Sequence, residues 1–296
     1  MKIVSLLPSA TEICFALGLE EQLEAVTFEC DFPDRAKNKP HATGNAIPQV
    51  DDPGEIDRLV RASLDSGEPI YTLDDELIRT IDPDLVLAQD LCRVCAVPSG
   101  HVEAALDRIG RRARVVSLDP SSLDDVIDCV QEVADAAGVA DRGREVVTDL
   151  RARLSRVRNA TAALPRVKTL SLEWSDPAFV GGHWVPEMVE AAGGIDVLGA
   201  PRHKSRTVDW SEIADAAAEV VVFMPCGYDL AAAVAEGKTL LDRSELGAAR
   251  SVYAVDATAY FSRPGPRVVD GVELLAWALH PDDFPAPPAG RVTRLR

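Results

Sequence analysis

KIVSLLPSATEICFALGL (residues 2–19) joins a short apolar run to a helical pattern across a proline and a serine. Residues 2–7 predict a buried strand, because a short run of apolar residues suits a sheet that is covered on both faces. Ser9 predicts a helix N-cap, and Glu12 three residues later completes a capping box. Gly18 then supplies a stop for the helix. A strand, a tight turn and a helix in this order predict the start of an α/β fold.

Strand and helix patterns alternate in two parts of the chain, on either side of a long helical stretch. Residues 1–121 and 165–285 each predict an α/β lobe with a mostly parallel sheet. Residues 122–164 lack a strand pattern and have helical spacing, so they predict a connecting segment. The Pro-rich residues 286–296 are expected to form a loose tail. The predicted fold class is two α/β lobes joined by one long connecting helix.

The composition fits a globular protein and argues against a nucleic-acid partner. The chain has 296 residues, of which 47% are hydrophobic, and this is enough for a sizeable core and two domains. Its formal net charge is −17, from 31 basic and 48 acidic residues. A nucleic-acid binder usually has the opposite sign or a local basic stripe. The arginines within residues 108–114 are followed at once by acidic sequence, so we interpret them as a solvated helix end.

The sequence contains no apolar run near the ~20 residues that a membrane-spanning helix needs. The apolar run before Pro8 is too short for the core of a signal peptide. We therefore expect a cytoplasmic protein without a transmembrane segment. In a reducing cytoplasm the six cysteines are expected to be thiols, metal ligands or redox groups, and not structural disulfides.

Four of the six cysteines follow predicted strands. These four are Cys30, Cys92, Cys95 and Cys226. Because ligands bind at the carboxyl ends of the strands in an open α/β sheet, the thiols are candidates for one shared site. With His183 as a further donor, they predict a metal site that would hold zinc or an iron–sulfur cluster. Cys14 and Cys129 lie on apolar helix faces and are expected in the core.

The pair Cys92 and Cys95 also permits two other interpretations. A CxxC motif before a helix is typical of thiol redox enzymes, because the helix N-terminus lowers the pKa of the first thiol. Two buried thiols that only pack are the other possibility. The common nucleotide, dinucleotide, zinc-protease and serine-hydrolase motifs are missing from the sequence.

SLEWSDPAFVGGHWVPEM (171–188) is the densest group of chemistry-bearing residues. Trp174 and Trp184 are two of only four tryptophans, and they predict either a flat apolar surface for a ligand or two core residues. Glu173 is expected at a strand end. His183, after two glycines, is either a metal ligand or a structural residue.

The segment AYFSRPGPR (259–267) follows the last predicted strand. Tyr260 and Arg263 are expected to point into a ligand site, where Arg263 would suit a carboxylate, a phosphate or an amide-rich ligand edge. The alternative is a loop held by its own hydrogen bonds.

The opening residues 2–19, the long helical connector and the ending VYAVDATAYFSRPGPRVVDGVELLAWALHP (252–281) resemble the cobalamin and iron-chelate class of solute-binding proteins of ABC importers. The resemblance extends over residues 2–281 and is strongest to the cobalamin-binding branch. It implies two α/β lobes joined by a rigid helix, with the ligand in the cleft between the lobes. It further implies a corrinoid or an iron or other metal chelate as ligand, and an ABC permease as partner if the protein is exported.

The resemblance assigns expected roles to the residues at the strand ends. Apolar contacts would come from Trp174, Trp184, Tyr228 and Tyr260, and polar contacts from Ser9, Glu29, Gln89, Glu173 and Arg263. His183 or a cysteine would bind cobalt or iron. Two alternatives stay open: a cytosolic metalloprotein or enzyme with a zinc or iron–sulfur site built from the cysteines, and a thiol redox enzyme that uses the CxxC pair.

Overall fold

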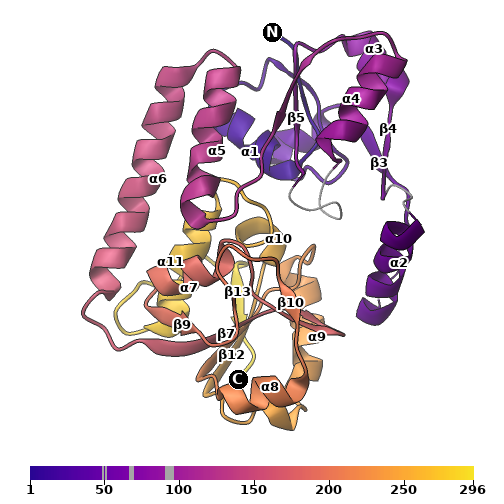
Figure 1. Cartoon of the computed structure of the whole chain (residues 1–296). Helices are drawn as coiled ribbons and strands as arrows, with labels where there is room; N and C mark the ends of the chain where they lie inside the picture. The colour runs from indigo at the N-terminus through magenta and orange to yellow at the C-terminus, as the bar shows by residue number, and fades with distance from the viewer. Residues whose placement is uncertain (49, 51, 67–69, 91–96) are drawn as a thin grey trace. The chain divides into compact units, whose positions relative to one another are not determined.

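The computed structural model describes residues 1–48, 50, 52–66, 70–90 and 97–296 (Figure 1). The chain forms two compact units. Unit 1 consists of Met1–Pro120 and Ile127–Thr148, and unit 2 consists of Ser121–Val126 and Asp149–Arg296. Among the described residues, no helix is both long and apolar enough to cross a membrane. The domain boundaries expected from the sequence stay a prediction.

Unit 1 is built on a four-stranded parallel sheet with the strand order β2-β1-β5-β6. The strands are β1 (Ile3–Ser5), β2 (Leu23–Ala25), β5 (Leu85–Ala88) and β6 (Arg114–Ser117). Both β1 and β5 are buried along their whole length, as expected for the central strands of a parallel sheet. The parallel sheet predicted from the apolar runs is therefore confirmed.

The helices of unit 1 alternate with its strands along the chain. They are α1 (Pro8–Ala16), α2 (Pro53–Ser66), α3 (Asp75–Ile81) and α4 (Ser99–Arg108), with a 3₁₀ turn η1 (Asp34–Asn38). A short antiparallel pair, β3 (Thr43–Asn45) and β4 (Tyr71–Leu73), completes the unit. Only three residues long, β3 is too short to show an alternating pattern.

The start of α1 differs from the prediction. The N-cap is Leu7, whose backbone is extended and whose side chain makes no capping hydrogen bond. Pro8 takes the first turn, which suits a residue that has no N–H and a fixed φ. Ser9 and Glu12 therefore lie inside the helix, both nearly buried, and the capping-box prediction is wrong.

Two helices contain residues of both units. They are α5 (Leu123–Ala136) and α6 (Ala140–Thr161), and they confirm the helical stretch expected there. In unit 2, Arg153 of α6 donates to Glu273 (2.7 and 3.0 Å) and to Asp270 (2.9 Å). These hydrogen bonds to two carboxylates raise the pKa of Arg153. The ion pairs attach the second half of α6 to α11 (Val268–Leu279).

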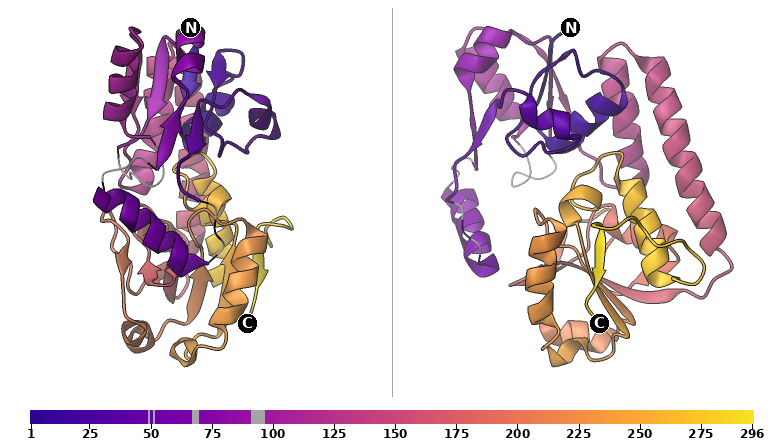
Figure 2. Two further views of the ribbon diagram at one scale, coloured as in Figure 1. Left: turned by 90° about the vertical axis from the view of Figure 1, so that its right-hand side faces the viewer. Right: turned by 180° about the vertical axis from the view of Figure 1, so that it is seen from behind.

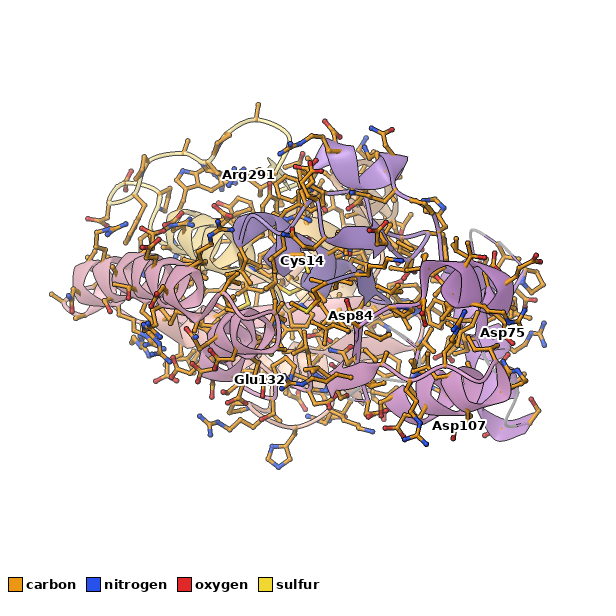
Figure 3. All side chains as sticks on the ribbon, turned by 90° about the horizontal axis from the view of Figure 1, so that it is seen from above. Cys14, Asp75, Asp84, Asp107, Glu132 and Arg291 are labelled. Atoms are coloured by element: carbon orange, nitrogen blue, oxygen red, sulfur yellow. The ribbon has the colours of Figure 1, made fainter. Side chains whose placement is uncertain are left out.

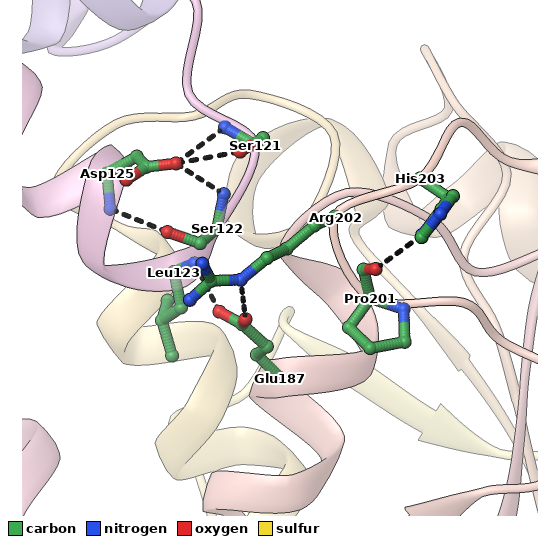
Figure 4. Close-up of polar contacts among 8 residues, drawn as sticks. All are labelled: Ser121, Ser122, Leu123, Asp125, Glu187, Pro201, Arg202 and His203. Atoms are coloured by element: carbon green, nitrogen blue, oxygen red, sulfur yellow. Dashed lines mark hydrogen bonds and ion pairs between the residues drawn. The ribbon is translucent and has the colours of Figure 1, made fainter.

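The first turn of α5 is fixed by two carboxylates (Figure 4). Asp125 accepts hydrogen bonds from the backbone N–H groups of Ser121 (3.0 Å) and Ser122 (2.9 Å). Glu187 of α7 (Val185–Ala191) accepts from the N–H of Leu123 (2.8 Å) and from Arg202 Nε (2.9 Å). Free N–H groups at a helix N-terminus need such acceptors, so α7 caps α5 from another part of unit 2.

Unit 2 is built on a seven-stranded mixed sheet with the order β10-β8-β7-β11-β12-β13, with β9 also paired to β7. The strands are β7 (Val167–Ser175), β8 (Ala178–Val180), β9 (Gly194–Asp196), β10 (Arg206–Thr207), β11 (Val220–Phe223), β12 (Ser251–Val255) and β13 (Val292–Arg294). The central strands β7, β11 and β12 are parallel. Because β13 pairs with β12, the expectation of a loose tail is wrong.

The two faces of this sheet are covered by different helices (Figure 2). Leu172, Phe223 and Val252 pack in one apolar cluster with side chains of α8 (Trp210–Ala216), α9 (Leu230–Leu240) and the 3₁₀ turn η2 (Ser244–Leu246). On the other face, α7 packs against β9 and α11. The short helix α10 (Ala257–Tyr260) follows β12 and precedes α11. This arrangement leaves the carboxyl ends of β7, β11 and β12 at one edge.

Candidate functional site

The carboxyl ends of β7, β11 and β12 bring three loops of unit 2 into direct contact. The N–H of Cys226, after β11, donates to Glu173 O at the end of β7 (3.2 Å). The N–H of Thr258, after β12, donates to Tyr228 O (3.1 Å). The rings of Trp174 and Tyr228 meet edge to face, with 5.4 Å between their centroids. Both aromatic rings are partly exposed, so they provide apolar surface at this edge.

The carboxyl of Glu173 has two hydrogen-bond donors and no cationic partner among the described residues. Gly182 N–H donates to Oε1 (3.2 Å), and Ser205 Oγ donates to Oε2 (2.5 Å). Loss of hydration raises the pKa of Glu173 to about 7; the two hydrogen bonds oppose this rise, and nearby Asp196 adds to it. The residue is thus poised between its neutral and charged forms at neutral pH.

The loop that carries His183 is held through its backbone. His183 N–H donates to His203 O (2.6 Å), and Arg202 N–H donates to His183 O (2.8 Å). The φ angle of His183 is 50°, in the left-handed region that non-glycine residues seldom adopt. The neighbouring Gly182 lies so close to residues 203–205 that a Cβ added to it would collide with their backbone.

The imidazole of His183 has an unused nitrogen. Its Nε2 is buried and has no hydrogen-bond partner among the described residues, and the same holds for Thr258 Oγ1 at the same strand-end edge. Burial, and to a smaller extent Lys204, lower the pKa of His183. A neutral imidazole with a free nitrogen is the form that binds a metal centre.

Trp184 supports this loop from the core side. It is 6% exposed, and its indole N–H donates to Phe261 O (2.8 Å). Its ring centroid lies 5.6 Å from that of His183. Both tryptophans were candidates for ligand contact. Trp174 is the more exposed of the two, whereas Trp184 is buried and packs near the His183 ring.

Tyr260 lies between two guanidinium groups at the end of α10. Arg291 lies 5.0 Å and Arg267 5.8 Å from the centroid of its ring. Burial raises the pKa of Tyr260, and both arginines oppose that rise. Arg263, in the same loop, is partly buried. Arg291 also forms an ion pair with Asp270 (3.5 Å), so its charge is partly balanced.

The residues predicted in unit 1 are mostly buried. Ser9, Cys30 and Gln89 are only 2–3% exposed. Gln89 Nε2 donates to Leu118 O (3.0 Å), and Cys30 Sγ lies 3.1 Å from Thr11 Oγ1. Glu29 is partly buried. Ser9, Cys30 and Gln89 are therefore buried inside unit 1. The ligand-binding roles expected for all four residues stay predictions.

The structure describes only two of the four cysteines of the predicted metal site, which stays a prediction. Cys92 and Cys95 lie outside the described residues, Cys30 is buried in unit 1, and Cys226 is exposed in unit 2. In the part of the chain that the structure describes, no three His, Cys, Asp or Glu side chains form a group that could hold a metal ion. Burial, followed by Cys30, raises the pKa of Cys14 (labelled in Figure 3) to about 12, so this thiol stays protonated.

Sequence reasoning missed Ser205, Asp196 and Thr258. Ser205 Oγ donates to Glu173, and Asp196, which is close enough to raise the pKa of Glu173, accepts a hydrogen bond from Ser171 Oγ. Each contact joins residues that are 25 or more positions apart, and neither segment has a periodic pattern. Folding alone brings these side chains together, so no local signal in the sequence points to them.

The model of the periplasmic binding protein family matches residues 3–261. The chain belongs to this family. The vitamin B12-binding protein of Vibrio cholerae is 23% identical over 278 residues, covering 92% of this chain and 86% of the relative. An uncharacterized ABC transporter substrate-binding lipoprotein of Bacillus subtilis is 24% identical over 294 residues, covering 96% and 81%.

Solved structures show the same fold. The periplasmic vitamin B12 binding protein of Vibrio cholerae superimposes with a TM-score of 0.67 at 22% identity, covering 94% of this chain and 96% of that one. A periplasmic heme binding protein of Pseudomonas aeruginosa gives a TM-score of 0.72 at 20% identity, with coverages of 99% and 97%. The family and fold class predicted from the opening and closing segments are therefore confirmed.

Membership of the periplasmic binding protein family corrects the predicted location. The expectation of a cytoplasmic protein is wrong, because the relatives are periplasmic proteins or lipoproteins outside the cytoplasm. That expectation relied on the lack of a leader-like apolar run, which is not a property of the folded domain. The reducing environment invoked for the cysteines no longer applies. The zinc, iron–sulfur and redox-enzyme alternatives have no support from this family of binding proteins.

Proposed function

We propose that this protein binds a cobalt corrinoid through the strand-end loops of unit 2 and delivers it to an ABC importer. The observation that carries the proposal is His183, whose neutral imidazole has a buried Nε2 without a partner. A metal at the centre of a flat macrocycle accepts such a nitrogen as an axial ligand. Relatives named for vitamin B12 binding support cobalt as that metal.

The surroundings of His183 suit the rest of a corrinoid. A macrocycle presents a broad apolar face, which the partly exposed rings of Trp174 and Tyr228 complement. Its edge carries amide groups, which suit the polar side chains of Tyr260 and Arg263. An exported binding protein of this family would pass the ligand to a permease, and a named ABC transporter lipoprotein among the relatives supports that partner.

The test compares aquocobalamin, which has an exchangeable axial position, with cyanocobalamin, in which cyanide blocks that position. Titration calorimetry should give a dissociation constant of about 1 μM or tighter for aquocobalamin, the usual range for a specific small-molecule site. The visible absorption of aquocobalamin should shift on binding, because imidazole replaces water at cobalt. Cyanocobalamin should bind without that shift.

The decisive variant is His183→Ala, with His203→Ala as its matched control. His203 lies on the 202–205 segment whose backbone binds His183. Its ring is exposed and, among the described residues, contacts Pro201 O (2.8 Å), so loss of the ring should leave binding unchanged. Loss of His183 should abolish the absorption shift and weaken aquocobalamin binding by about tenfold. Binding of haemin without binding of any corrinoid would show that the ligand is an iron macrocycle, and the corrinoid proposal would be wrong.

A further inference from the structure

One carboxyl group connects the two chain segments that surround His183. Glu173 accepts from Gly182 N–H (3.2 Å) on one segment and from Ser205 Oγ (2.5 Å) on the other. Gly182 directly precedes His183, and Ser205 follows the residues whose backbone binds His183. Glu173 itself lies on β7, a nine-residue strand of the central sheet. Glu173 therefore connects two loop segments to a strand of the central sheet.

The two segments touch at the position that Glu173 supports. A Cβ on Gly182 would overlap Ser205 N and would lie 2.7 Å from His203 O. Glycine is therefore needed for this close approach. Because the segments have no space to slide at this point, a bond to both of them fixes their relative position.

The position of these segments determines where the His183 ring lies. Both backbone groups of His183 are used, since its N–H donates to His203 O (2.6 Å) and its carbonyl accepts from Arg202 N–H (2.8 Å). The left-handed φ of 50° is uncommon for a residue with a side chain and needs support from its surroundings. A change at Glu173 would thus be transmitted to the imidazole through two backbone hydrogen bonds.

The charges around Glu173 also indicate that its carboxyl acts as a hydrogen-bond acceptor within the fold. No Lys, Arg or His nitrogen forms an ion pair with it among the described residues, and the other carboxylate nearby is Asp196. Asp196 is itself held by Ser171 Oγ and by the N–H groups of Leu198 and Gly199. A residue kept for a negative charge would have a cation within reach, whereas Glu173 has only hydrogen-bond donors.

We propose that Glu173 is a positioning residue, which holds the Gly182–His183 turn against the 202–205 segment so that His183 faces the metal of the ligand. This inference rests on the proposed corrinoid function. It replaces the sequence-based expectation that Glu173 contacts the ligand directly.

The test uses Glu173→Gln and Glu173→Ala with aquocobalamin and cyanocobalamin as probes. Glutamine keeps an oxygen for Gly182 N–H and can donate to Ser205 Oγ, so it should keep aquocobalamin affinity within about twofold and preserve the absorption shift. Alanine removes both contacts and should weaken aquocobalamin binding about tenfold and reduce the shift. Cyanocobalamin, which needs no axial nitrogen, should lose less than about threefold.

Ser205→Ala gives a second, milder variant that leaves the carboxyl in place. It should weaken aquocobalamin binding by about two- to fivefold, because one of the two hydrogen bonds is kept. Thermal unfolding of every variant shows whether the fold is intact. Equal losses in Glu173→Gln and Glu173→Ala would overturn the proposal, since they would mean that the charge itself contacts the ligand. Unchanged binding in Glu173→Ala would also overturn it.

Amide hydrogen exchange on the ligand-free protein separates this inference from the corrinoid proposal. Glu173→Ala should speed exchange at Gly182 and His183 by about tenfold, while Glu173→Gln should not. If the wild-type protein binds no corrinoid, the proposed function fails and the exchange result still decides whether Glu173 positions the turn. Unchanged exchange at both amides in Glu173→Ala would refute the positioning role.

Discussion

His183 combines two features that each reduce stability. A buried polar atom without a partner costs about 1–3 kcal/mol, and a non-glycine residue in the left-handed region costs about 1 kcal/mol or more. Both costs occur at one residue, at the end of the central strands of unit 2. Surrounding contacts from His203, Arg202 and Trp184 keep the residue in place. Such a combination is typical of a residue kept for binding.

The raised pKa of Glu173 predicts a pH dependence of stability. Folding raises the pKa from its ordinary value of 4.5 to about 7, so the folded protein binds the proton more tightly than the unfolded chain. The stabilisation from the protonated form is fully present below pH 4.5 and is lost as the pH rises to about 7. The loss is of the order of 3 kcal/mol.

Chemical denaturation of the wild type and Glu173→Gln between pH 4.5 and pH 7.5 measures this effect, because glutamine does not titrate. The wild type should lose stability relative to Glu173→Gln as the pH rises from 4.5 toward the folded-state pKa of about 7. Other titrating groups contribute equally to both proteins and cancel in the comparison. Two parallel stability curves would show that Glu173 has an ordinary pKa.

At the scale of elements, the long apolar runs were predictable and the short polar strands were not. Buried strands such as β5 and β11 have continuous apolar sequences, and α5 has clear helical spacing. By contrast, β9 and β10 have two or three residues each and are fixed by pairing with distant strands. The same difference applies to the site: Glu173 and His183 stand out in the sequence, whereas Ser205 becomes relevant only after the chain has folded.

Because Glu187 caps the N-terminus of α5, its replacement should lower the stability of the protein. Glu187→Ala removes the acceptor for Leu123 N–H and the ionic partner of Arg202. The exposed ion pair contributes little, so the lost cap should dominate and lower stability by about 1 kcal/mol. Denaturant unfolding measures the loss.

The matched control is Glu190→Ala, three residues further along α7. Glu190 is exposed and forms an ion pair with Arg166 at 3.7 Å, without capping a helix. Its replacement should change the free energy of unfolding by less than about 0.5 kcal/mol. Equal effects of the two variants would mean that the cap on α5 is not a stabilising contact.

At the scale of the whole molecule, α5 and α6 are the elements that belong to both units. The boundary between units falls between Thr148 and Asp149, within the continuous helix α6, and between Val126 and Ile127 in α5. Each unit has its own sheet and its own apolar cluster. Because each of these helices is continuous across a unit boundary, we expect unfolding of one unit to destabilise the other.

Asp149→Pro should weaken that coupling. Proline in a helix interior removes a backbone hydrogen bond and clashes with the preceding turn, at a cost of about 3 kcal/mol. Asp149 is exposed, so its side chain contributes little packing, and Asp149→Ala is the matched control that keeps the helix. Scanning calorimetry should show one transition for the wild type and the alanine variant, and two separated transitions for the proline variant. A single transition that only moves to lower temperature in Asp149→Pro would show that the units unfold together without a continuous α6.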